Sequence, residues 1–196
     1  MNRYKILSEM SQKRGKIFVL SAPAGTGKTT LVKRLTRDFP HVVQSISFTS
    51  RSKRPNEVNG VDYNFVSIEE FQDKLANGDF LEHAKVYEDY YGTDRLFVES
   101  QLEEGNHVFL VIDTQGARQI MGKVPAVFIF VSPPNMQELR HRLSARQTES
   151  LEIVNERLSW AEKEMEVGKL YQYQIVNDEL EKAYQELKQI VIAEDH

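Results

Sequence analysis

Residues 16–31 read KIFVLSAPAGTGKTTL, and this stretch decides the fold. The apolar run at 17–20 predicts a buried strand, and the small residues after it predict a turn. Leu31 and Leu35 then recur at helical spacing, so we expect a helix that Pro40 ends. A strand, a Gly-rich turn, a Lys-Thr pair and a helix are the layout of a phosphate-binding P-loop.

The turn has the residue types that phosphate binding requires. Gly25 and Gly27 let the backbone bend and bring its N–H groups close to phosphate oxygens, and the helix N-terminus adds partial positive charge. Lys28 supplies a full charge to the β- and γ-phosphates, and the Thr29 hydroxyl can ligate Mg²⁺. The first Gly of the usual pattern is Ala22 here, which is small enough for the loop to close.

The alternative is a Gly-rich connection that packs and binds nothing, but it does not account for the Lys-Thr pair at the helix start. We therefore predict a phosphate-binding loop with these residues: Ala22, Pro23, Ala24, Gly25, Thr26, Gly27, Lys28, Thr29 and Thr30.

The composition is that of a soluble globular protein with one sizeable core. The chain has 196 residues, of which 40% are hydrophobic and 28% charged. A net charge of −4 does not favour nucleic acid or anionic membranes as partners. The absence of cysteine excludes disulfides and thiol catalysis. No stretch resembles a signal peptide or a membrane span, so we expect a cytoplasmic protein.

A second strand carries a candidate active-site acid. The apolar run at 108–112 ends on Asp113, which is the form of a Walker-B strand. In a P-loop fold this acid lies beside the Mg²⁺ and the phosphates, whereas in any other fold it could simply cap the following helix. The strand alone leaves both interpretations open, and the Lys28-Thr29 pair favours the first.

The remaining elements alternate in type, which predicts a mainly parallel sheet covered by helices on both faces. Further strands are expected at 42–48, 61–66, 126–131 and 173–176, and irregular β structure at 80–91. Helices are expected from 68 to a stop at Gly78, at 95–104, from 135 through 143, at 151–167 and at 178–193. The mixed stretch at about 49–96 interrupts the alternation and is predicted to form a separate subdomain.

Basic residues gather in two places. Arg51 and Arg54 flank Lys53, and a second cluster contains Arg142 and Arg146. A short basic run is often only a solvated turn. Two such clusters in an acidic chain suggest two phosphate-bearing ligands, or one ligand held from both sides.

The order of several motifs resembles one known family. These motifs are SAPAGTGKT at 21–29, Ser47 with Thr49, RPNEVNGVDYNF at 54–65, FLE at 80–82, YYGT at 90–93, DTQG at 113–116 and IVND at 175–178. Together they resemble the guanylate kinases over residues 15–194. The blocks at 54–65 and 90–93 are specific to that family, whereas a P-loop alone is not.

The resemblance implies the reaction ATP + GMP → ADP + GDP with Mg²⁺, in purine nucleotide metabolism and GMP recycling. It implies an α/β fold: a P-loop NTPase-type parallel sheet flanked by helices, with a mixed α+β nucleotide-binding insert and a helical lid. On this basis we expect a tail at 1–14, a core at about 15–48, 97–138 and 168–194, a GMP-binding insert at about 49–96, and a lid at about 139–167.

The resemblance also implies residue roles. The GMP phosphate would be held by Arg51, Arg54, Tyr63 and Tyr91. Guanine would contact Ser47, Glu82 and Thr93. Asp113 would lie where the GMP site meets the metal, and Asn177 near the adenine of ATP. The residues with a catalytic role would be Lys28, Arg51, Asp113 and the lid arginines Arg142, Arg146 and Arg157.

The chemistry of Glu82 agrees with a guanine site. Guanine offers two adjacent donors, N1–H and the N2 amine, which one carboxylate can accept, whereas adenine presents an acceptor at N1. The acceptor phosphate oxygen is already ionised near pH 7, so no general base is needed, and we read the histidines as structural. Trp160 is expected to pack a helix.

Two other functions remain possible from the sequence. One is another P-loop kinase for small phosphorylated substrates, including a bisphosphate-sugar kinase. The other is a guanylate-kinase-like scaffold that binds protein partners without catalysis. The expected ligands are ATP and GMP, with no nucleic acid or membrane partner, in a monomer or homodimer.

Overall fold

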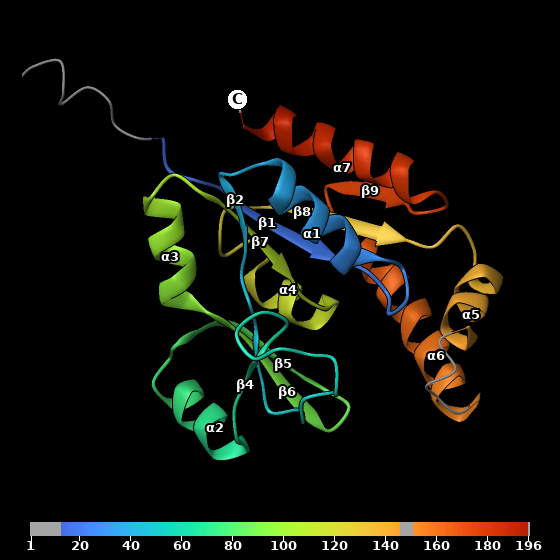
Figure 1. Ribbon diagram of the computed structural model, residues 1–196, viewed down its shortest axis with the longest axis horizontal. Helices are drawn as coiled ribbons and strands as arrows, with labels where there is room; N and C mark the ends of the chain where they lie inside the picture. The colour runs from blue at the N-terminus through green and yellow to red at the C-terminus, as the bar shows by residue number, and fades with distance from the viewer. Residues whose placement is uncertain (1–12, 146–150, 196) are drawn as a thin grey trace, which may run out of the picture.

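A computed structural model describes residues 13–145 and 151–195. Its centre is a parallel sheet of 5 strands in the order β2-β7-β1-β8-β9 (Figure 1). The strands are β1 (Ile17–Ser21), β2 (Val42–Gln44), β7 (His107–Val111), β8 (Ala126–Ser132) and β9 (Tyr173–Val176). Strand β1 is the central one, so the loop that follows it leaves the middle of the sheet.

Helices cover both faces of this sheet, because successive side chains of a buried strand point to opposite sides. Phe18 and Leu20 pack against α1 (Lys28–Asp38) and α7 (Leu180–Glu194). Ile17 and Val19 pack on the other face, in a cluster that includes residues of α3 (Arg95–Glu103) and α4 (Thr114–Ile120). The expected α/β architecture is therefore confirmed.

A second sheet of 4 strands, in the order β4-β3-β6-β5, lies within residues 48–94. Its strands are β3 (Phe48–Thr49), β4 (Asn64–Phe65), β5 (Phe80–Val86) and β6 (Asp89–Asp94). Helix α2 (Ile68–Ala76) packs on it through Phe71, whose ring stacks on Phe80 at 4.6 Å between centroids. Ser67 and Glu70 begin this helix with the expected capping box.

One expectation about this region was wrong. The run at 42–48 is two strands, because the chain leaves the first sheet after Gln44 and enters the second at Phe48. The stretch at 80–91, expected to be irregular β structure, is part of an antiparallel hairpin of β5 and β6 whose register shifts between Phe80 and Glu82. The run at 61–66 contributes only a short strand, β4.

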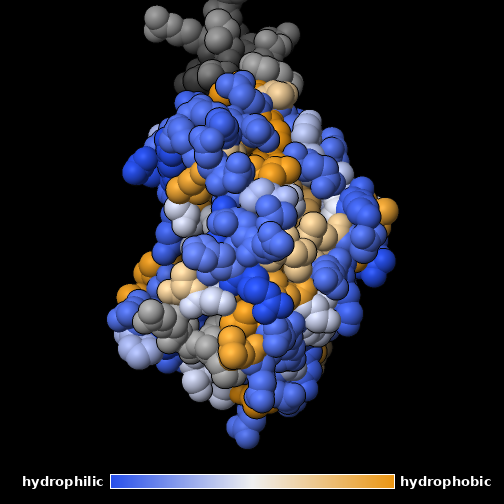
Figure 2. All heavy atoms as spheres, turned by 90° about the vertical axis from the view of Figure 1, so that its right-hand side faces the viewer, coloured by the Kyte–Doolittle hydropathy of each residue, from blue (hydrophilic) through white to orange (hydrophobic). Residues whose placement is uncertain are grey.

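Helices α5 (Met136–Ser144) and α6 (Leu151–Gly168) form a small core of their own. This core contains Leu139 and Leu143 from α5 and Val154 and Leu158 from α6. Figure 2 shows the side of the molecule on which these helices lie; it is mostly hydrophilic, with apolar residues in small groups. Among the described residues, no helix is long and apolar enough to cross a membrane.

Candidate active site

The loop between β1 and α1 has the geometry expected of a P-loop. Gly25 and Gly27 have φ of 90° and 89°, a conformation that glycine adopts without strain. The backbone N–H and the hydroxyl of Thr26 both donate to the carbonyl of Pro23. Ala22 is buried, and its carbonyl accepts from Lys28 Nζ at 3.2 Å. The loop thus closes with alanine in place of the usual first glycine.

Asn177 lies against this loop. Its Nδ2 donates to the carbonyl of Thr26 at 2.6 Å, and a Cβ on Gly27 would approach the same nitrogen to 2.9 Å. Arg142 supports this side of the loop, since its Nη1 donates to the carbonyl of Asn177 at 2.9 Å. The end of β9 and helix α5 are therefore tied to the P-loop.

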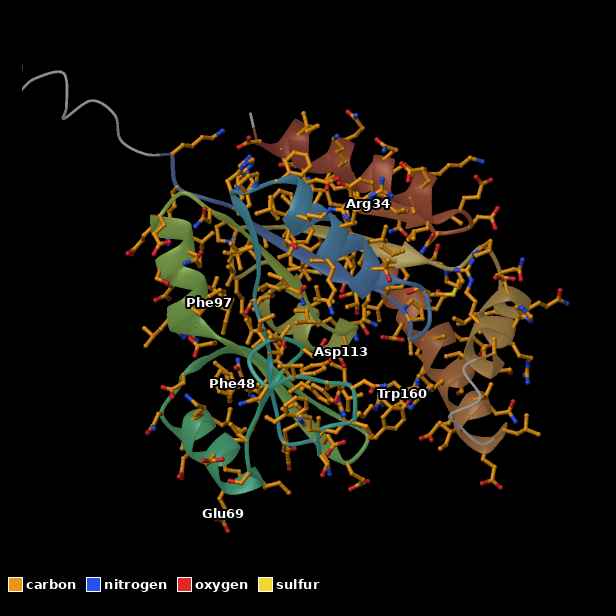
Figure 3. The ribbon with its side chains drawn as sticks, in the orientation of Figure 1. Arg34, Phe48, Glu69, Phe97, Asp113 and Trp160 are labelled. Carbon is orange, nitrogen blue, oxygen red and sulfur yellow. The ribbon has the colours of Figure 1, made fainter. Side chains whose placement is uncertain are left out.

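The sequence left open whether Asp113 caps a helix or lies in a phosphate-binding site, and the structure shows that it caps a helix and lines a cavity. Its Oδ1 accepts from the backbone N–H of Gly116 at 2.8 Å, so it caps α4, and its Oδ2 accepts from Gln115 Nε2 at 3.0 Å. It also lines a cavity together with Lys28. Figure 3 shows Asp113 between the central sheet and the second sheet. The cap fixes the carboxylate at the edge of this cavity.

The cavity has a volume of about 210 Å³ and joins four parts of the chain. Its walls come from the P-loop, the end of β7, the second sheet and α6. The predicted site residues that line it are Ala22, Ala24, Lys28, Ser47, Tyr63, Glu82, Tyr91 and Asp113. Residues expected to serve two different ligands therefore face one space.

Glu82 is the most deeply buried acid of this cavity, with 4% of its surface exposed. It pairs across the hairpin with Thr93, whose hydroxyl donates to Oε1 at 2.5 Å. Burial raises the pKa of Glu82 to about 7; the Thr93 hydroxyl opposes this rise and the charge of Asp113 adds to it. A Cβ on Gly116 would lie 2.0 Å from Glu82 Oε2, so glycine is required there.

A second group of predicted residues surrounds Arg51. Its Nη2 binds Glu57 Oε1 at 2.8 Å, and its guanidinium lies 5.4 Å from the centroid of the Tyr63 ring. Tyr63 and Tyr91 meet edge to face at 5.8 Å. Glu57 also accepts from the backbone N–H of Arg54, whose side chain is exposed. Glu57 therefore holds the side chain of Arg51 and the backbone of Arg54.

A model of the family described as guanylate kinase matches residues 14–194. The chain belongs to the guanylate kinase family. A guanylate kinase of Protochlamydia amoebophila is 54% identical over 184 residues, covering 94% of this chain and 93% of the relative. One of Chlamydia felis is 47% identical over 182 residues, covering 92% and 89%. The crystal structure of a guanylate kinase from Anaplasma phagocytophilum aligns with a TM-score of 0.78 at 36% identity, covering 95% and 89%.

Membership of the guanylate kinase family confirms the expected enzyme class, a phosphotransferase. Of the expected lid arginines, the two within the described residues, Arg142 and Arg157, do not line the cavity. Arg142 binds Glu138 Oε1 at 2.7 Å besides the carbonyl of Asn177. Arg157 lies on α6, and Arg146 falls outside the described residues.

The cavity residues that sequence reasoning missed include Tyr87, Trp160 and Glu164. Trp160, expected to pack a helix, is on the cavity wall instead. Burial raises the pKa of Glu164 to about 7, and the charge of Lys28 opposes the rise. Spacing could have revealed Glu164, because it continues the buried stripe of α6 three residues after Ala161.

One group outside the cavity has the composition of a metal site. Ligand atoms of His41, His107 and Asp195 lie within 4.8 Å of one another. However, His107 Nδ1 accepts from the backbone N–H of Lys16 at 3.1 Å, so the neutral ring carries its proton on Nε2. That nitrogen lies 3.0 Å from Asp195 Oδ1 and donates to it. The cluster is satisfied without a metal and fastens the end of α7 to the sheet.

Proposed function

We propose that this chain transfers the γ-phosphoryl group of ATP to GMP through the cavity between the P-loop and the second sheet. One observation supports this above all: Lys28, a donor-side group, and Glu82, an acceptor-side group, line the same space of about 210 Å³. In-line transfer requires donor and acceptor to meet without intervening water, and a shared cavity meets that requirement.

Glu82 selects guanine in this proposal. As a carboxylate it accepts from N1–H and the N2 amine, while the Thr93 hydroxyl donates to Oε1 and holds the side chain. Ser47, at the edge of the second sheet, completes the base contacts. Adenine would set its N1 lone pair against the carboxylate, and rejection by an unpaired buried polar group reaches about 10⁴-fold.

The acceptor phosphate is bound by Arg51, Arg54, Tyr63 and Tyr91. Arg51 is already held by Glu57 at 2.8 Å, so little side-chain freedom is lost when a phosphate binds. Planar guanidinium groups suit a phosphate because they donate two parallel hydrogen bonds. A phosphate oxygen of GMP is ionised near neutral pH, and the reaction therefore needs no general base from the protein.

The donor side fits Mg²⁺ and the ATP phosphates. Thr29 is an exposed residue in the first turn of α1, and Asp113 lines the cavity with Lys28. The Thr29 hydroxyl and the Asp113 carboxylate are hard oxygen donors of the kind that Mg²⁺ prefers. Mg²⁺ held there would help to neutralise the negative charge of the ATP phosphates. The P-loop N–H groups and Lys28 hold the same phosphates, and Asn177 borders the adenine side.

The lid arginines, Arg142, Arg146 and Arg157, complete the site by covering the transferred phosphoryl group. Arg142 is engaged by Glu138 and by the carbonyl of Asn177, so it must exchange these partners to reach the phosphate. Closure of residues 139–167 over the cavity would also exclude water.

A substrate panel tests the proposal. ADP release is measured with ATP–Mg²⁺ and, in turn, GMP, AMP, dTMP and ribose bisphosphate. We expect turnover with GMP and about 10⁴-fold lower kcat/KM with AMP. Turnover with ribose bisphosphate but not with GMP would overturn the assignment. Titration calorimetry with ATP–Mg²⁺ distinguishes a kinase from a scaffold, because a scaffold would not bind the nucleotide.

A further inference from the structure

An aromatic contact joins α6 to the second sheet across the cavity. The rings of Tyr87 and Trp160 meet at 67° with their centroids 5.9 Å apart, an edge-to-face arrangement. Both residues line the cavity. Tyr87 lies in the turn between β5 and β6, and Figure 3 shows Trp160 on the side of α6 that faces this end of the hairpin.

The backbone at Tyr87 is in an unfavourable conformation. Its φ is 56°, and no other non-glycine residue within 13–145 or 151–195 has a positive φ. Glycine and asparagine are the usual residues at such a position, because a Cβ clashes with the backbone there. Strain of this kind persists when other contacts hold the residue, and the ring contact with Trp160 is one such contact.

Trp160 also lies near a cation, because Lys163 Nζ is 5.4 Å from the centroid of its ring. Ala84 and Val86 from β5 contribute apolar side chains to the lining of the same cavity. Tyr87 keeps 42% of its surface exposed, so the aromatic pair lies at the solvent-facing rim of the cavity.

We propose that Tyr87 and Trp160 form a closure contact that holds α6 against the second sheet, which makes both of them positioning residues for transfer to GMP. The inference rests on the function proposed above. The contact biases the site toward a closed arrangement before ligands bind, so less binding energy is spent on closure. It also narrows the path by which water reaches the γ-phosphate.

The size of the expected effects follows from the free energy of an aromatic pair. Losing one pair changes the equilibrium constant between the open and closed arrangements by roughly 2- to 12-fold. Removing either ring lowers kcat/KM for GMP by about that factor. It also raises ATP hydrolysis by water relative to transfer. Tyr87→Asn is the sharpest variant, because asparagine suits the positive φ and the turn should fold at least as well. Tyr87→Phe keeps the ring and serves as the matched control.

The closure contact can be observed without turnover. Trp160 is the chain's single tryptophan, so tryptophan fluorescence reports the surroundings of this one ring. We expect acrylamide to quench ligand-free Tyr87→Asn more strongly than the wild type, and Tyr87→Phe to behave like the wild type. Unchanged quenching in Tyr87→Asn overturns the contact. The quenching experiment does not depend on the substrate. It therefore tests the closure contact separately from the proposed phosphorylation of GMP.

A double-mutant cycle tests the positioning role. Tyr87→Asn, Trp160→Ala and the double variant are compared in kcat/KM and in ATP hydrolysis, with Trp160→Phe as the control for the aromatic ring. The double variant should lose no more than the larger single loss. The inference is overturned if the loss in kcat/KM of the double variant equals the product of the two single losses. It is also overturned if acrylamide quenching rises in a variant whose kcat/KM and ATP hydrolysis are unchanged. Melting curves of each variant show whether a loss reflects unfolding.

Discussion

Replacing Glu82 by glutamine should weaken catalysis and stabilise the ligand-free protein at the same time. The carboxyl has 4% of its surface exposed, and burial raises its pKa from 4.5 to about 7. The folded protein therefore holds a proton that the unfolded chain releases. Stability is lost as the pH rises from about 4.5 to about 7, because the unfolded state binds fewer protons in that window.

The shift sets the size of the effect. About 2.5 pKa units at 1.36 kcal/mol each correspond to an upper bound of about 3 kcal/mol lost above pH 7. Glutamine carries no charge and can still accept from Thr93, so the variant avoids this loss. At pH 8 it should melt higher than the wild type, by up to about 10 °C. At pH 5 the two should melt alike.

The same substitution should cost GMP turnover about 2–4 kcal/mol, or about 30- to 1,000-fold in kcat/KM, because one acceptor becomes a donor facing guanine's donors. For the wild type, GMP should bind more tightly as the pH rises through about 7, since the carboxyl must lose its proton to accept both hydrogen bonds.

Melting curves of the ligand-free proteins at pH 5, 6, 7 and 8 measure the stability effect, and steady-state ADP release measures the catalytic one. Glu99→Gln, an exposed change on α3, is the control and should alter neither. A stability difference that does not grow with pH would refute the reasoning about burial. An unchanged kcat/KM for GMP would remove Glu82 from the site.

Three further changes test other parts of the structure. Gly116→Ala should displace Glu82, because the new Cβ would lie 2.0 Å from Oε2, and KM for GMP should rise at least tenfold; an unaltered KM argues against the packing. Lys28→Ala should abolish turnover while calorimetry still detects GMP, and retained turnover contradicts the P-loop assignment. Phe71→Ala should cost about 3–5 kcal/mol in denaturant unfolding, because the ring is fully buried; a loss below 1 kcal/mol would be inconsistent with that burial.

The sequence predicted those parts of the fold that local patterns control. The P-loop was recognisable because Gly25 and Gly27 supply positive φ where the turn needs it, and α2 because Ser67 and Glu70 form a capping box. The break after Gln44 could not be predicted, since an extended apolar pattern does not tell which sheet a residue joins.

The site was predictable only in part, for a similar reason. Family motifs identified Glu82 and Asp113, and the structure brings both to one cavity. Trp160 and Tyr87 carry no motif, and their role depends on a contact between segments more than seventy residues apart in the sequence. The positions of Arg142 and Arg157 depend on how α5 and α6 pack together, which no local sequence pattern encodes.

The start of α4 links the two halves of the site in a way that limits how the enzyme can change. Asp113 caps this helix through the N–H of Gly116, and the missing side chain of Gly116 makes room for Glu82. A single helical turn thus sets the spacing between Asp113, which we propose lies beside the phosphates, and Glu82, which we propose lies beside the base. Redesign toward another nucleobase would have to alter both ends of that turn together, so substrate preference and phosphate chemistry are inherited as one unit.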